Sequence, residues 1–210
     1  MPYSLSIDFT RFFLSSYPGA VLQALPIVLL TGAIYWLVKY RNDTAAPAAQ
    51  KLLKTLFVAY LAGIACMVFF YSSIRYFWGF IFGENKASNI LTVFFCKRTA
   101  NFIPDFYRRL NRERILNVVL FLPFGFLYPL ANRVDSWAKT VRTGLITIVL
   151  IEALQPVFAR AFDVNDLILN AFGVLFSATV FFLLRRIVGR IREKRQAAAQ
   201  NQDPESTPSE

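Results

Sequence analysis

The chain has 210 residues, of which 56% are hydrophobic and 16% aromatic, and its mean hydropathy is +0.44. This composition excludes an ordinary soluble domain, because the apolar residues are gathered in long runs. The net charge of +10 does not indicate a nucleic-acid partner, since the basic residues lie beside those runs, as in the loops of membrane proteins. The chain has no histidine and two cysteines, which excludes His-dependent nucleophilic pairs and a disulfide framework.

Five apolar stretches are long enough to cross a bilayer, which takes roughly 20 residues at about 1.5 Å rise each. They lie near residues 19–38, 53–74, 115–131, 141–159 and 166–184. The first is expected to be a retained anchor and not a cleaved signal peptide, because Asp8 and a lone Arg11 precede it in place of a basic region. The sequence therefore predicts an all-α polytopic membrane bundle of about five transmembrane helices, plus a short interfacial or re-entrant segment.

The connection 75–114 contains that additional segment. Its apolar pieces 76–83 and 87–96 are each too short to span, so they dip into the membrane, lie along it, or jointly form a sixth span. In 101–114, apolar residues recur at helical spacing with arginines opposite. That pattern predicts a helix, either interfacial against anionic headgroups or packed on the bundle.

The basic residues predict the orientation of the chain. Six Lys and Arg residues between Arg185 and Arg195 directly follow the last apolar stretch, which favours a cytoplasmic C-terminus and an external N-terminus. The polar tail 196–210 has the composition of a disordered segment. We expect three parts: an extra anchor with a cytoplasmic loop (1–52), a four-helix membrane domain (53–185), and a basic juxtamembrane segment with a disordered tail (186–210).

Polar residues cluster at one end of three predicted helices. Asn117 opens the third, Glu152 and Gln155 lie near the close of the fourth, and Asp166 and Asn170 open the fifth. Consecutive spans run in opposite directions, so these ends share one membrane face, and spacings of three and four place each pair on one helix face. Polar groups in hydrocarbon are costly and mark bundle interiors or functional sites.

The short turn between the fourth and fifth helices contributes Arg160 and Asp163. Arg160 is expected to pair with Glu152, Asp163 or Asp166. The alternative is that Asp166 caps the fifth helix while Asp163 favours its dipole. Glu152, about two turns or ~10 Å inside the predicted helix end, does not fit a cap. The candidate binding residues are thus Asn117, Glu152, Gln155, Arg160, Asp163, Asp166 and Asn170, and the structural residues at a kink or close helix contacts are Pro123, Gly125 and Gly173.

The strings NVVLFLPFGFLYPL (117–130), IEALQPVFARAFDVNDLILNAFGVLFS (151–177) and NFIPDF (101–106) resemble the VanZ-like membrane protein family. The family pattern marks Asn101, Pro104 and Phe106 in addition to the residues above. Residues 53–185 would form the VanZ-like unit, and the first anchor lies outside it. The resemblance implies a multi-spanning protein of the bacterial cytoplasmic (inner) membrane. The family is named for an accessory protein of resistance to the glycopeptide teicoplanin.

Two functions from different classes follow. In the first, an outward-facing polar pocket binds a lipid headgroup, a cell-wall precursor or a glycopeptide-related ligand, with a link to envelope or antibiotic tolerance. In the second, Glu152 with Asp163 or Asp166 performs acid–base chemistry on a lipid-linked substrate at the membrane edge. Substrate or proton translocation is a third, weakened by the lack of polar residues in the cytoplasmic helix halves.

The expected partners are membrane lipids, with no nucleic acid. We see no metal-ligand spacing and expect no cofactor, although a carboxylate-only Mg²⁺ or Ca²⁺ site is compatible with the composition.

Overall fold

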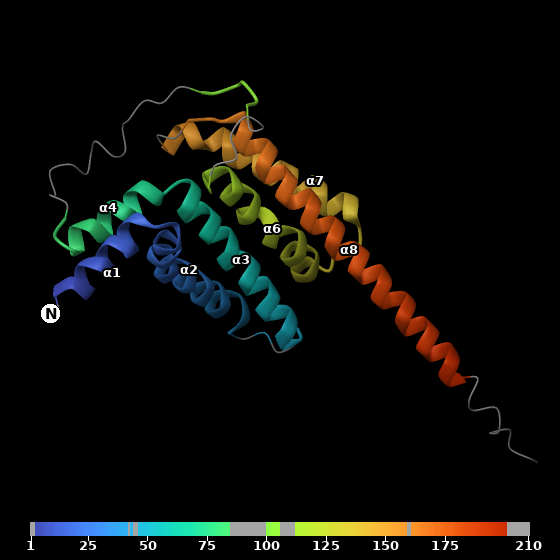
Figure 1. The fold of residues 1–210 in the computed structure, drawn as a ribbon. Helices are drawn as coiled ribbons and strands as arrows, with labels where there is room; N and C mark the ends of the chain where they lie inside the picture. The colour runs from blue at the N-terminus through green and yellow to red at the C-terminus, as the bar shows by residue number, and fades with distance from the viewer. Residues whose placement is uncertain are drawn as a thin grey trace, which may run out of the picture.

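The computed structural model describes residues 3–41, 43, 46–84, 100–105, 112–158 and 161–200. These residues form a helical bundle (Figure 1). Its elements are α1 (Tyr3–Ser15), α2 (Tyr17–Tyr40), α3 (Ala48–Val68), α4 (Tyr71–Ile81), α6 (Arg112–Asn132), α7 (Trp137–Leu154), the 3₁₀ helix η2 (Gln155–Phe158) and α8 (Val164–Gln200). Within the described ranges, the only β-type pairing is an isolated bridge between Asn101 and Asp163.

The five predicted spans are confirmed, since α2, α3, α6, α7 and α8 are long and apolar enough to cross a membrane. Two of these α-helices end earlier than predicted. The second span ends at Val68, because Phe69 and Phe70 turn away to pack on the Phe158 ring, with centroids at 4.8 and 5.2 Å. The fourth span ends as an α-helix at Leu154, where Pro156, which has no backbone N–H, lies in a 3₁₀ turn.

Helices α1 and α4 are tied to the start of α2. The Phe13 ring of α1 lies 5.3 Å from the Trp78 ring of α4, edge to face. The buried Gln23 side chain donates to the Phe13 carbonyl at 2.5 Å, and Trp78 Nε1 donates to the Gln23 carbonyl at 3.1 Å. With 11 residues, α4 is too short to span a bilayer. The piece 87–96, and with it the question of a sixth span, lies outside the described residues.

The predicted helix over 101–114 is wrong at its start. Residues 101–105 have no helical structure, because the backbone of Asn101 pairs with Phe162 and Val164 across the turn before α8. Residues 106–111, including the motif residue Phe106, lie outside the described part of the chain, and α6 begins at Arg112.

The centre of the bundle is the crossing of α6 with α8. Gly125 of α6 lies against Ser177 and Ala178, and Gly173 of α8 lies against the Val118 carbonyl, so the two backbones are nearly in contact. Small residues permit such close approach between membrane helices. Phe121 and Phe124 fill the space beside this crossing and are 0% and 1% exposed.

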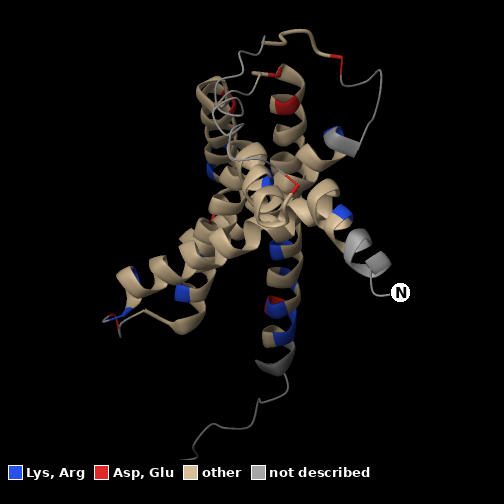
Figure 2. Cartoon of the chain, turned by 90° about the vertical axis from the view of Figure 1, so that its left-hand side faces the viewer, with Lys and Arg blue, Asp and Glu red and all other residues tan. Residues whose placement is uncertain are grey.

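The bundle has two chemically different ends. We call the end at which α6 and α8 begin the cluster face, and the end at which α3 and α7 begin the basic face. Lys and Arg gather near the basic face and along the part of α8 that continues beyond the bundle (Figures 1 and 2). This helix runs to Gln200, so residues 196–200 are helical where their composition predicts disorder, because they extend an established helix. Residues 201–210 are outside the described part.

Candidate functional site

The centre of the candidate site is Glu152, which is 0% exposed in the last turn of α7. The Asn170 side chain of α8 donates from Nδ2 to its Oε1 at 3.2 Å. A carboxylate in the last turn of a helix faces the negative end of the dipole, which is unfavourable. Glu152 therefore does not serve as a cap, and its burial requires polar partners such as Asn170.

Two buried amide side chains, one of them the Asn170 already described, lie near Glu152 in the chain or contact it. Gln155, the first residue of η2, and Asn170 are each 3% exposed. The Asn170 side chain donates to Glu152, but its Oδ1 accepts no hydrogen bond from any residue in the described ranges. A buried acceptor left without a donor is costly, so it indicates a place where a ligand or water donor would be favourable.

One turn closer to the start of α8, Asn117 of α6 donates from Nδ2 to Asp166 Oδ1. Asp166 lies in the first turn of α8, where the helix dipole favours a negative charge. Because Asp166 and Asn170 are four residues apart, this pair and the Glu152–Asn170 pair share one face of α8. The alternating helix directions thus bring α6, α7 and α8 together as the spacing indicates.

Asp163, and not Asp166, caps α8. The Asp163 carboxylate accepts from the backbone N–H of Asn165 at 2.9 Å and from the Asn101 side chain at 3.2 Å. The alternative in which Asp166 is the N-cap is excluded, because α8 begins at Val164 and places Asp166 in the third helical position. Asp163 therefore holds the 101–105 segment on the helix start.

Sequence reasoning missed a second polar group beside the cap. Asn165, 2% exposed, accepts from the Asp105 backbone N–H at 2.8 Å and donates to the Ile103 carbonyl at 3.3 Å. Asp105 forms an ion pair with Arg114 at 2.7 Å. The spacing places Asn165 off the face of Asp166 and Asn170, so only the folded 101–105 segment buries it. The motif string NFIPDF was the available signal.

The residues of the candidate site lie within a region of the chain that matches a known family. A family model described as VanZ/LLP1 matches residues 57–185. The chain belongs to the VanZ/LLP1 family. The match confirms the resemblance read from the sequence, and it runs from within α3 to within α8. No match was found among curated proteins or among solved structures.

All seven candidate binding residues fall in the VanZ/LLP1 region, whereas α1 and α2 precede it. The structure joins Glu152 to Asn170 and Asn117 to Asp166, and it places Asp163 in the cap with Asn101. Arg160 lies outside the described residues, so its pairing stays a prediction. Within the described ranges, no group of three or more His, Cys, Asp or Glu side chains is arranged to hold a metal ion.

Proposed function

We propose that this VanZ/LLP1 protein binds the polar headgroup of a lipid or lipid-linked cell-wall precursor at the cluster face. The supporting observation is the buried Asn170 amide, whose Oδ1 is an available acceptor next to the buried Glu152 carboxylate. Asp166, one turn from Asn170 on the same face of α8, adds a second carboxylate to the site. Such an acceptor-rich site favours ligands with hydroxyl, amide or ammonium donors. Glycolipids, peptidoglycan precursors and glycopeptides all carry these groups, so a role in envelope or antibiotic tolerance is compatible with the site.

The proposal includes an orientation, with the cluster face outside and the C-terminus in the cytoplasm. It is supported by the cations at the basic face and on the extension of α8, which the positive-inside rule places in the cytoplasm. A reporter protein that works only in the cytoplasm should be active when it is fused after Arg195. Activity at the same position of a reporter that works only outside the cytoplasm would show that the orientation is the reverse.

Ligand binding is tested with protein purified into nanodiscs containing a native bacterial lipid extract. Mass spectrometry of the bound lipids should find one headgroup class enriched in the wild type. The isosteric Glu152→Gln variant and Gln155→Leu should lose that enrichment while keeping the wild-type melting temperature within a few degrees. The matched control is Thr147→Val, since the Thr147 hydroxyl donates only within α7, to the Thr143 carbonyl at 2.8 Å. Equal lipid profiles in all four proteins would refute the proposal.

A second candidate, an intramembrane enzyme, is favoured by one observation. Glu152 is a fully buried carboxyl group that accepts from the Asn170 side chain, and a carboxyl group held in a dry site at the membrane edge is a candidate general acid or base. The same nanodiscs distinguish the two functions. A time-dependent change in lipid mass with wild-type protein, absent with Glu152→Gln, would indicate turnover, whereas unchanged masses with retained enrichment would indicate binding.

A further inference from the structure

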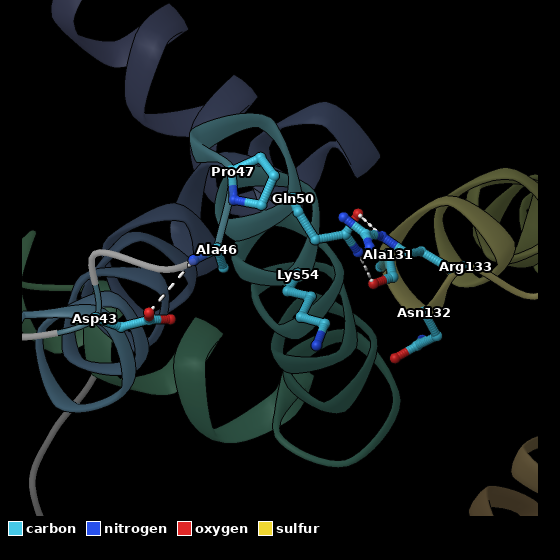
Figure 3. Close-up of a pocket in the computed structure, with 8 residues that line it drawn as sticks. All are labelled: Asp43, Ala46, Pro47, Gln50, Lys54, Ala131, Asn132 and Arg133. Atoms are coloured by element: carbon cyan, nitrogen blue, oxygen red, sulfur yellow. Dashed lines mark hydrogen bonds between the residues drawn. The ribbon is translucent and has the colours of Figure 1, made fainter.

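A cavity of about 400 Å³ lies at the basic face, between the start of α3 and the end of α6. It is at the opposite end of the bundle from Glu152 and is independent of the function proposed above. Figure 3 shows Gln50 and Lys54 extending from α3 and Asn132 and Arg133 from the end of α6, with Asp43 across from them. The described lining carries two cations, Lys54 and Arg133, and one carboxylate, Asp43.

Gln50 fixes one of the cations in place. Its Nε2 donates to the carbonyls of Ala131 and, at 3.4 Å, Leu130, and its Oε1 accepts from Arg133 Nε at 3.0 Å. This bond leaves the two Nη groups of Arg133 without a hydrogen-bond partner in the described part of the chain. The Lys54 ammonium likewise donates to no acceptor within the described ranges. Two cationic donor groups therefore border one cavity with unused hydrogen-bonding capacity.

The start of α3 adds a third favourable element. Its N-cap is Pro47, which makes no side-chain capping bond, and the Pro47 carbonyl accepts from the N–H groups of Gln50 at 3.0 Å and Lys51 at 3.2 Å. In the described part of the chain, the N–H groups of Ala48 and Ala49 therefore have no capping partner. The positive end of the helix dipole thus borders the cavity, on the same helix as Lys54. Together with the two cations, it favours an anion.

The cavity lies at the level of the membrane headgroups. The rings of Trp36 and Tyr40 lie 5.7 Å apart near the end of α2, and Lys51 Nζ lies 5.7 Å from the Tyr40 ring centroid. Trp137, at the start of α7, is 42% exposed. Aromatic residues and lysines at helix ends form the belt that marks the membrane–water interface. The phosphates of lipid headgroups are the anions that lie at this level of the membrane.

We propose that this cavity binds the phosphate of an anionic phospholipid from the leaflet at the basic face. With two cations and one carboxylate, the lining has a net charge of +1, which the single negative charge of a phosphodiester balances. Basic pockets between transmembrane helices suit such headgroups. Lys54 and Arg133 hold the phosphate oxygens, and the start of α3 stabilises the charge.

The backbone of Arg133 permits a test that separates binding from folding. Its φ of 52° lies in the left-handed region, and the Val134 N–H donates to the Pro129 carbonyl at 3.0 Å, as in a Schellman helix end. Glycine is the preferred residue at this position. Arg133→Gly removes the guanidinium but retains the helix end, so its melting temperature without added lipid should equal or exceed that of the wild type.

The test uses delipidated protein in neutral detergent and native mass spectrometry with added dioleoylphosphatidylglycerol, dioleoylphosphatidylcholine or inorganic phosphate. The variants are Lys54→Gln, Arg133→Gly and the control Lys139→Gln, an exposed cation near the same face that does not line the cavity. We expect phosphatidylglycerol to bind at least fivefold more than phosphatidylcholine to wild type and Lys139→Gln. Lys54→Gln and Arg133→Gly should lose that preference.

Three results would overturn the inference. Equal binding of the two lipids to the wild type would remove the anionic selectivity. Unchanged selectivity in Lys54→Gln and Arg133→Gly would place the lipid elsewhere. Displacement of phosphatidylglycerol by millimolar inorganic phosphate would show that the cavity takes a soluble phosphate, and not a lipid.

Discussion

Helices α2 and α8 differ in burial far more than in hydropathy. Their most apolar windows have mean hydropathies of 2.0 and 2.3, yet 17% of the α2 window is buried in the bundle against 33% of the α8 window. The difference arises at the contacts. A Cβ added at Gly32 of α2 would meet Ala59 at an ordinary 3.5 Å, whereas one added at Gly173 of α8 would clash with the α6 backbone. Hydropathy identifies a span, but small residues at the contact determine how closely it packs.

Helices α2 and α8 also differ in what their buried polar side chains do. In the described ranges, α2 buries one polar side chain, that of Gln23, which donates to α1. The Gln23 backbone carbonyl accepts from Trp78 of α4. By contrast, α8 contributes Asp166 and Asn170 to the polar cluster, and it lies largely in the VanZ/LLP1 region. The tight α6–α8 pair holds the candidate site, and the N-terminal helices pack beside it.

The largest effect should come from filling the α6–α8 crossing. A Cβ at Gly125 would lie 2.7 Å from the Ser177 carbonyl carbon, and one at Gly173 would lie 3.3 Å from the Val118 carbonyl carbon, with closer atoms on both sides. Gly125→Leu and Gly173→Leu should therefore lose folded protein in detergent, as measured by size-exclusion chromatography and thermal melting. Overpacking against side chains typically costs about 1–3 kcal/mol. The cost here should exceed that of every other variant below, because the atoms met include backbone, which cannot move aside. Gly189→Leu, with nothing within 4 Å, is the control. Wild-type stability in both variants would contradict the packing.

Next in size is the buried charge. Arg160→Ala should destabilise the protein by about 3–5 kcal/mol if Arg160 pairs with the carboxylates of the cluster, because a buried charge loses its partner. Arg192→Ala, on the exposed extension of α8, should change stability by less than about 0.5 kcal/mol. Denaturant titration of both variants measures the difference. Equal, small effects would show that Arg160 does not neutralise the cluster.

A smaller effect is expected at the cap of α8. Asn165→Ala removes the side-chain bonds to Asp105, Ile103 and Asp163, so it should cost about 1–3 kcal/mol and release the 101–105 segment. Thermal melting measures the loss of stability, and hydrogen exchange of residues 101–105 measures the release of the segment. Asn132→Ala, at an exposed helix end, is the control. Unchanged exchange in Asn165→Ala would mean that the backbone bonds of Asn101 hold the segment alone.

The smallest effect concerns the N-terminal helices. Trp78→Phe keeps the ring against Phe13 but removes the bond to the Gln23 carbonyl, so it should cost about 1 kcal/mol. We expect faster tryptic cleavage after the exposed Arg11, with no change in the lipid enrichment proposed for the cluster. Loss of that enrichment would show that α1 and α4 act on the site, and the division between support and function would fail.

The sequence alone determined the class of the protein and the level of its polar cluster. Long uncharged runs predict helices that satisfy their own backbone in lipid. Alternating helix direction then places Asn117, Glu152 and Asn170 near one end, because direction and spacing are properties of the chain itself. The glycines at positions 125 and 173 likewise carry a local signal of close approach.

Only the tertiary structure decided which polar groups meet and where the helices end. Phe69 and Phe70 end α3 because they pack on Phe158, which is 88 residues from Phe70. Asn165 is buried because the 101–105 segment folds over it, and Asp163 caps α8 in place of Asp166, which sequence reasoning had left as an alternative. The cavity at Lys54 and Arg133 forms because α3 and α6 are side by side. Contacts between residues distant in sequence depend on how the helices pack, and helical periodicity specifies the faces of a helix without specifying its neighbours.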